Sequence, residues 1–121
     1  MPSFGTLKAD TLTHSTAGSL ATNFVVEGSA KAWCRASTAA ALNDSFNIAS
    51  GTDSGTGDYE FTFTNNMETS LISGSATAVS SAGRLAGYHG TATTGYGIEV
   101  HDTNGNKGDA GTHHQTFGDL A

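Results

Sequence analysis

The chain has 121 residues and a net charge of −6, and Gly, Ser and Thr together supply 47 of its residues. The acidic balance disfavours sequence-independent binding to nucleic acid, which needs many cationic contacts with phosphates. No apolar run approaches the roughly 20 residues needed to cross a membrane. Val, Ile, Leu and Phe supply only 20 residues, so we expect one small domain whose thin core is supplemented by burial between subunits.

The charged fraction of 13% argues against a disordered chain, despite the shortage of large apolar residues. Because Cys34 is the only cysteine, an intrachain disulfide is excluded. A lone cysteine is typical of a protein made in a reducing cytoplasm, where it serves as a small apolar residue.

The first third of the chain contains short segments that favour strands. Residues 6–14 are β-prone, and the apolar run 23–27 ends at Gly28. Residues 39–42 form either a single helical turn or a loop. Residues 29–37 alternate between two faces: Ala30, Ala32, Cys34 and Ala36 fall on one, and Lys31, Trp33 and Arg35 on the other.

The clearest hairpin is predicted over residues 44–64. Phe46 and Ile48 share one face of its first strand, and the segment 51–58 is rich in residues that accept positive φ, as in a turn. The second strand alternates, as a half-buried antiparallel strand does. Its apolar face carries Tyr59, Phe61 and Phe63.

Further strands are predicted over residues 70–79, 83–89 and 96–102, with turns at 80–83 and 103–106. Tyr96, Ile98 and Val100 share one face of the last of these strands. Short strands at this spacing predict an all-β fold, a small antiparallel sandwich or open barrel. We expect residues 1–20 to form an extended N-terminal docking arm and residues 21–121 a single β-domain.

Several segments resemble a module found in many bacteriophage virion proteins. They are AKAW at residues 30–33, DSFNIAS at 44–50, and DSGTGDYEFTF at 53–63, followed by Met67. The opening TLKADTL at residues 6–12 is similar to the start of phage fibre-like proteins. The resemblance covers about residues 5–67. It departs from the module's usual Asn/Gly/Thr-rich link at 34–43 and does not extend beyond residue 68.

This resemblance implies a β-rich, surface-exposed and often trimeric virion component, made in the host bacterial cytoplasm. Two roles stay open. In the first, a non-enzymatic homotrimer decorates and stabilises the capsid by binding the major capsid protein. In the second, a tail fibre or spike, attached to tail proteins, recognises a host surface glycan. We favour decoration because 121 residues leave little room for a fibre shaft and a receptor-binding tip.

Two groups of residues are candidates for contact with partners. Leu7, Lys8, Asp10 and Leu12 are the expected docking residues of the arm. Lys31, Trp33 and Arg35 form a candidate face for a neighbouring subunit or a host glycan, because Trp and Arg are typical interface anchors. That second assignment requires the alanines of residues 30–36 to face the core, and the opposite orientation, with Trp33 buried, stays open.

The sequence contains no motif for catalysis, and we expect neither enzymatic activity, cofactor nor metal. His113 and His114 are adjacent, so in a strand they point to opposite faces and only one can face a symmetry axis. The segment 102–109 begins like a calcium loop but lacks its sixth-position Gly and closing Glu, which favours a plain hairpin turn. Glu60 and Glu99 are interpreted as residues of solvated strand faces rather than as a glycosidase pair.

Overall fold

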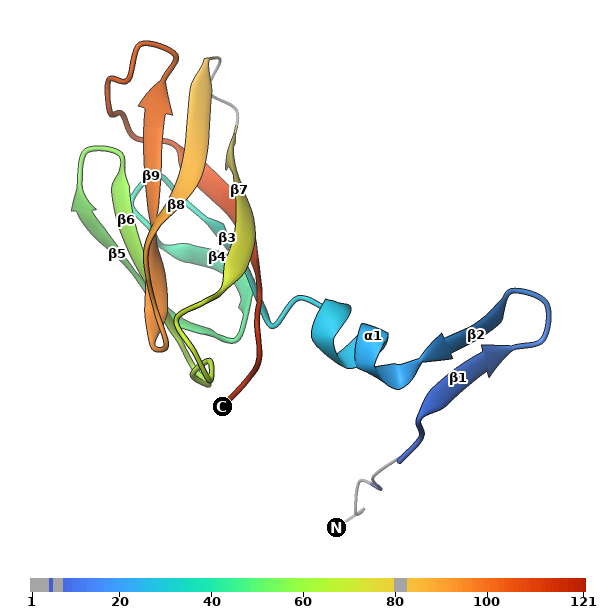
Figure 1. Cartoon of the computed structure of the whole chain (residues 1–121). Helices are drawn as coiled ribbons and strands as arrows, with labels where there is room; N and C mark the ends of the chain where they lie inside the picture. The colour runs from blue at the N-terminus through green and yellow to red at the C-terminus, as the bar shows by residue number, and fades with distance from the viewer. Residues whose placement is uncertain (1–4, 6–7, 80–82) are drawn as a thin grey trace.

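The computed structural model describes residue 5, residues 8–79 and residues 83–121. Two four-stranded antiparallel sheets pack face to face, and an arm made of a two-stranded hairpin and a short helix precedes them (Figure 1). The predicted all-β class and antiparallel sandwich are therefore confirmed. Leu7, one of the predicted docking residues, lies outside the described residues.

The elements follow one another along the chain with short connections. The arm contains β1 (Thr11–His14), β2 (Gly18–Ala21) and α1 (Thr22–Gly28). The first sheet has the order β4-β3-β10-β7, from strands Leu42–Phe46, Ala32–Ala36, Gly111–Phe117 and Ser73–Val79. The second sheet has the order β5-β6-β9-β8, from strands Ile48–Gly55, Asp58–Phe63, Gly95–Asp102 and Arg84–Ala92.

The core lies between the two sheets and combines large residues on one side with small residues on the other. The second sheet supplies Tyr59, Phe61 and Phe63 from β6 and Tyr96, Ile98 and Val100 from β9, all of which are buried as predicted. The first sheet faces them with small residues, so that bulky rings fill the space without overpacking. These small buried residues include Ala32, Cys34 and Ala36 of β3.

The predicted first strand of the 44–64 hairpin is wrong in one respect, because it is broken at Asn47. Residues before the break belong to β4 in the first sheet, and residues after it belong to β5 in the second. Asn47 has φ 57°, which turns the chain sharply. As a result Phe46 is exposed and Ile48 is buried, so the two do not share a face.

The hairpin that follows is tighter than predicted. β5 continues to Gly55, so that only Thr56 and Gly57 remain for the turn where residues 51–58 were expected. Gly57 has φ 64°, and a Cβ there would lie 2.3 Å from the Val100 carbonyl oxygen. Glycine is therefore required at this position both for its conformation and for its space.

The second half of the chain contains the three predicted strands and one more. β7, β8 and β9 correspond to the predicted segments 70–79, 83–89 and 96–102, with shifted ends. Of the predicted turn at 80–83, residues 80–82 lie outside the described residues. The additional strand is β10, which lies between β3 and β7 in the first sheet. Residues 39–41 form a loop, not a helical turn.

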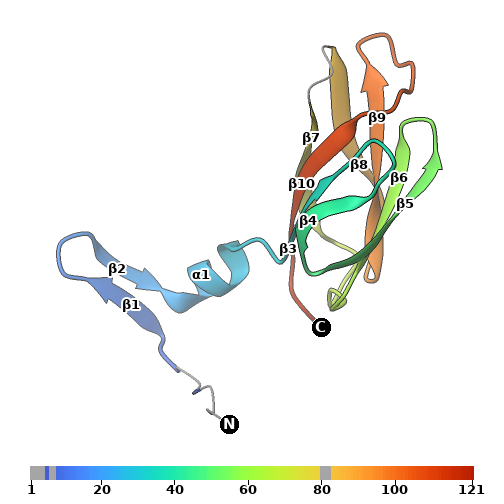
Figure 2. The same ribbon diagram turned by 180° about the vertical axis from the view of Figure 1, so that it is seen from behind.

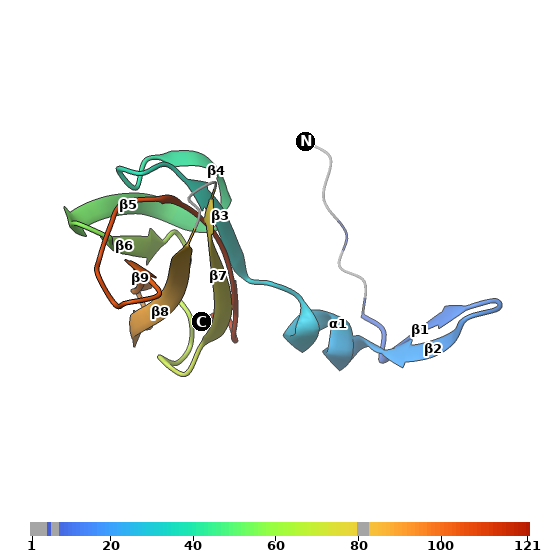
Figure 3. The same ribbon diagram turned by 90° about the horizontal axis from the view of Figure 1, so that it is seen from above.

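The boundary between arm and sandwich also differs from the sequence-based division at residue 20. Residues 22–28 form a helix that projects from the sandwich together with the hairpin (Figures 1, 2 and 3). The apolar residues of this segment are consecutive and do not alternate, so no strand pattern opposes the helix. The β-domain therefore begins near Ala32, and the arm extends to Gly28.

Candidate functional site

The arm presents apolar side chains that the sandwich does not cover. Phe24 and Val26 of α1 are 65% and 64% exposed, and among the described residues the helix has no buried one. Leu12 and Leu20 face each other across the β1–β2 hairpin and are also exposed. Exposed apolar groups concentrated on a projecting element mark a surface for another molecule.

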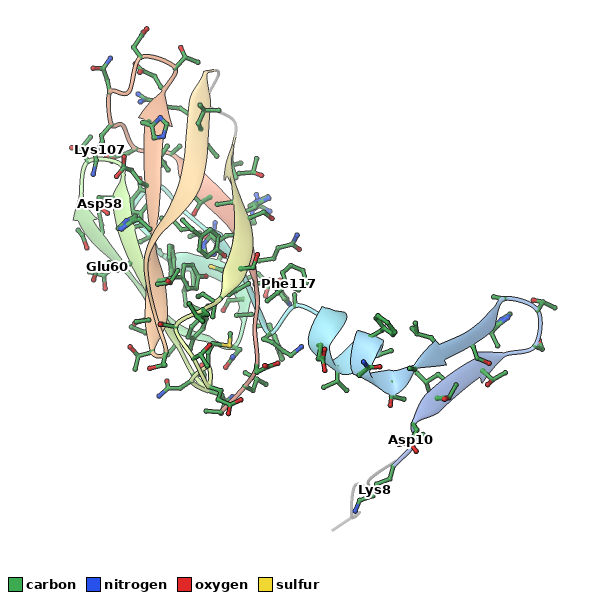
Figure 4. All side chains as sticks on the ribbon, in the orientation of Figure 1. Lys8, Asp10, Asp58, Glu60, Lys107 and Phe117 are labelled. Atoms are coloured by element: carbon green, nitrogen blue, oxygen red, sulfur yellow. The ribbon has the colours of Figure 1, made fainter. Side chains whose placement is uncertain are left out.

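The structure brings three of the predicted docking residues together in one groove. Lys8, Asp10 and Leu12 line it with Val25 and Val26 of α1, and its volume is about 460 Å³. The backbone and side chain of Thr22 donate to the carbonyls of Asp10 and Ala9, at 2.9 and 2.6 Å, and so hold the start of the arm against the helix. Figure 4 shows Lys8 and Asp10 on the arm, far from the sandwich.

Lys31 does not join Trp33 and Arg35, because it precedes β3 and is buried at the junction between arm and sandwich. Its Nζ donates to the carbonyl of Val26, in the last turn of α1, and to that of Ser29 at 2.8 Å. A cation at this end of a helix satisfies free carbonyls and interacts favourably with the helix dipole. Lys31 therefore caps the end of α1 and is not a residue of the exposed face.

The outer face of the first sheet carries Trp33 and Arg35, which resolves the alternative left open by the sequence. Ala32, Cys34 and Ala36 face the core, whereas Trp33 is 40% exposed and its neighbour on β4, Phe46, is 53% exposed. A groove of about 370 Å³ lies on this face. Its lining is Trp33, Cys34, Arg35, Ser75, Thr77, His113, His114 and Gln115.

The register of the strands arranges the outward side chains in two rows across the sheet. In one row Arg35 pairs with His113, which pairs with Thr77. In the parallel row Trp33 pairs with Gln115, whose Nε2 donates to Ser75 Oγ at 3.3 Å. β10 is therefore essential to this face, because it places His113 and Gln115 beside the residues of β3.

His113 and His114 point to opposite faces of β10, as predicted from their adjacency. His113 is exposed, whereas His114 is buried and its Nδ1 shares a hydrogen bond of 2.6 Å with the Tyr96 hydroxyl. His114 Nε2 has no hydrogen-bond partner among the described residues. Burial, with a smaller contribution from the neighbouring His113, lowers the pKa of His114 to about 4.

Two further tyrosine hydroxyls bridge distant segments inside the sandwich. Tyr88 donates to the carbonyl of Gln115 at 2.9 Å and shares a hydrogen bond with Thr116 Oγ1. Burial raises the pKa of Tyr88 to about 12. Tyr59 donates to the Thr38 carbonyl and accepts from the backbone N–H of Ala110. These bonds satisfy polar groups in the core and fix the two sheets against each other.

The outer face of the second sheet carries ion pairs instead of aromatic groups. Lys107 Nζ lies 3.1 Å from Glu99 and 3.4 Å from Asp58, which also contacts His89 at 2.9 Å. The bond to Glu99 is the main cause of a raised pKa at Lys107. Figure 4 shows Asp58 and Lys107 near one end of this sheet, with Glu60 further along it. Glu99 is thus held by Lys107 and lies on an outer strand face, as expected.

Cys34 and Asp102, which the sequence analysis also considered for chemistry, take part in the packing of the core and in a turn. Cys34 is buried, and burial, with a smaller contribution from Asp44, raises the pKa of its thiol to about 11. Asp102 closes a turn by accepting from the backbone N–H groups of Asn104 and Asn106. Over the described ranges no group of three or more His, Cys, Asp or Glu residues is placed to hold a metal ion. The one helix described is too short to cross a membrane.

Sequence reasoning missed the contribution of β10 to the exposed groove. The alternation of residues 112–116, with His113 and Gln115 between buried neighbours, was the available signal. It was weak because the inward residues are Thr112, His114 and Thr116, which are polar and do not form an apolar stripe. Comparison of the chain with models of protein families, with curated proteins and with solved structures gave no match.

Proposed function

We propose that this protein is a non-enzymatic structural component of a bacteriophage virion, a homotrimer that decorates the capsid through its N-terminal arm. One observation carries the proposal: the arm exposes its apolar side chains and projects away from a sandwich that has its own core. An element of this kind gains its stabilisation from another chain, since burial of Phe24 and Val26 would contribute about 1.5–3 kcal/mol each.

The junction supports docking because Lys31 links the end of the arm to the sandwich. Lys31 bonds the end of α1, and the backbone N–H of Lys31 donates to Thr116 of β10 at 2.8 Å. The phage assignment rests on the resemblance of residues 5–67, and its segments 44–50 and 53–63 supply the crossover at Asn47 and the β5–β6 hairpin.

The surface area of the chain supports association between copies. Its accessible surface is 7477 Å², whereas a compact monomer of 12.3 kDa exposes about 6,100 Å². The projecting arm contributes exposed apolar side chains to this surface, and contacts with other chains would cover them. Oligomers of this kind are usually closed and symmetric, which fits the proposed trimer on the virion surface.

A second candidate function is a tail fibre or spike protein that binds a host surface glycan. The observation that favours it is the groove on the first sheet, where Trp33 and Arg35 are exposed together. Copy number in purified virions separates the two roles. Quantitative mass spectrometry is expected to find hundreds of copies with the head fraction, whereas a few copies with the tail fraction would overturn decoration in favour of the fibre.

Attachment through the arm is tested with the Phe24→Ser/Val26→Ser double variant. Purified protein is added to virions that lack it, and binding is measured by co-sedimentation. The double variant, like deletion of residues 1–20, is expected to lose at least tenfold in affinity, because it removes the apolar contacts of the arm. The control Leu85→Ser removes an exposed apolar side chain of β8 and is expected to bind normally. Unchanged attachment of the double variant would contradict arm docking.

A further inference from the structure

We propose that the groove on the outer face of the first sheet binds an anionic saccharide, a sugar ring that carries a carboxylate. This inference rests on the second candidate function, glycan binding at this groove, and specifies its ligand class. It does not depend on capsid decoration, which concerns the arm. The groove is built from three strands: β3 supplies Trp33 and Arg35, β10 supplies His113 and Gln115 in the middle, and β7 supplies the hydroxyls of Ser75 and Thr77 on the far side.

The aromatic wall is Trp33, which is the only tryptophan of the chain. Its ring is partly exposed although it stands on a strand whose inward residues are small and buried. A flat aromatic ring that is partly exposed to solvent can stack against the apolar C–H face of a pyranose ring. Phe46 lies beside Trp33 on β4, whereas on the groove side its neighbour is the polar Gln115 of β10, which a purely apolar partner would not need.

The polar groups of the groove match a ring with hydroxyls. Gln115 lies beside Trp33 in the neighbouring strand, and its amide reaches Ser75 Oγ. Thr77 lies next to His113 on the same outer face. Amide and hydroxyl groups both donate and accept hydrogen bonds, so they can pair with sugar hydroxyls, which also do both.

The charge of the groove is opposite to that of the protein as a whole. The chain has 11 Asp and Glu against 5 Lys and Arg, yet the groove lining contains Arg35 and His113 and no carboxylate. None of the ion pairs among the described residues includes Arg35, although Asp44 is its cross-strand neighbour on β4. A guanidinium without a bound carboxylate is suited to a bidentate contact with the carboxylate of a ligand.

The test uses the intact protein and trigalacturonate as the probe. Because Trp33 is the only tryptophan, its fluorescence reports on this groove alone. We expect saturable changes in Trp33 emission and a matching binding heat in calorimetry. Galactotriose, which is neutral, is expected to bind at least tenfold more weakly, and acetate at equal charge concentration is expected to give no saturable signal.

Substitutions at the two arginines identify the site. Arg35→Gln is expected to weaken trigalacturonate binding about 10- to 100-fold, the loss typical of hydrogen bonds to a charged group, and Arg35→Lys is expected to be intermediate. The matched control, Arg84→Gln, changes the other arginine, on β8 of the second sheet, and is expected to bind within twofold of the unsubstituted protein.

Three results would overturn the proposal. They are the absence of any saturable signal with trigalacturonate, equal binding by the Arg35→Gln and Arg84→Gln variants, and equal affinity for the charged and neutral sugars. If subunits instead cover this face, Trp33 will be protected from quenching by acrylamide in solution and no sugar will bind. None of these results bears on virion attachment, which is measured separately through the arm.

Discussion

His114 places an ionisable group in the core of the sandwich, beside the hydroxyl of Tyr96. Its imidazole stacks at a tilt against the ring of Phe61, with the ring centroids 4.4 Å apart. Protonation would put a positive charge among aromatic side chains, and the part of the chain that the structure describes offers Nε2 no hydrogen-bond acceptor. Such a charge is costly in an apolar interior, which is why the pKa of His114 falls.

This residue predicts that acid destabilises the fold. Because the pKa of His114 is about 4 in the folded chain and about 6.5 in an unfolded one, the unfolded state binds the additional proton between these values. The free energy of unfolding is therefore expected to be fully retained above pH 6.5 and to fall as pH decreases towards 4, by up to about 3 kcal/mol. Urea unfolding at a series of pH values, followed by Trp33 fluorescence, measures this change in the free energy of unfolding.

The comparison with His114→Asn isolates this contribution from that of the carboxylates. Asparagine keeps an amide near the position of Nδ1 and does not titrate, so the variant is expected to lose most of the pH dependence between 6.5 and 4. His14→Asn, at the exposed end of β1 in the arm hairpin, is expected to keep this pH dependence. Identical pH profiles for unsubstituted protein and His114→Asn would refute the assignment.

At the scale of elements, the break between β4 and β5 decides how the sandwich closes. Asn47 adopts a left-handed conformation, and its side chain fastens the corner to both neighbouring segments. Its Oδ1 accepts from the backbone N–H of Asn65 at 2.7 Å, and its Nδ2 donates to the carbonyls of Lys31 and Asn65, both at 3.1 Å. Corners at which one strand passes between sheets need such a bend.

We predict that Asn47→Ala lowers the free energy of unfolding by about 2–4 kcal/mol. The substitution removes these hydrogen bonds, and alanine then holds the strained positive φ with no bond to compensate for it. Asn47→Gly loses the same bonds but relieves the strain, so it is expected to recover about 1 kcal/mol of this loss. Asn43→Ala, at an exposed position of β4, serves as the control. A change below 0.5 kcal/mol for Asn47→Ala, the range of ordinary surface substitutions, would show that the corner is held by other contacts.

At the scale of the whole molecule, the two sheets differ in what they present outwards. The first sheet exposes Trp33, Arg35 and Phe46, whereas the second exposes the ion pairs around Lys107. The arm leaves from the start of β3 in the first sheet. The apolar arm is suited to contact with other chains, whereas the outer face of the first sheet stays open for the proposed saccharide.

The proposed trimer predicts a mass of three times 12.3 kDa in native mass spectrometry and light scattering. We expect copies to associate because association buries the exposed apolar side chains of the arm and the free edges of the sheets. The Phe24→Ser/Val26→Ser variant and the Leu85→Ser control show whether the arm contributes to this assembly as well as to attachment. A monomer that persists at high protein concentration would contradict the trimer.

The sequence by itself determined the all-β class, the alternation of β3, β6 and β9, and the presence of a turn within residues 51–58. These features depend on neighbours a few residues apart, since side-chain direction alternates along a strand and glycine permits positive φ. The same local reasoning predicted that Tyr59, Phe61 and Phe63 form one buried face, and the structure confirms it.

Only the tertiary structure decided which face of β3 is buried, where the 44–64 hairpin is broken, and which strand lies beside Trp33. Ala32 and Trp33 are both compatible with the core until the aromatic residues of the opposite sheet occupy the available volume. The break at Asn47 depends on hydrogen bonds to Lys31 and Asn65, which are distant in sequence. The groove exists because β10 pairs with β3 across most of the chain length, and a long-range pairing of this kind leaves no local pattern in the sequence.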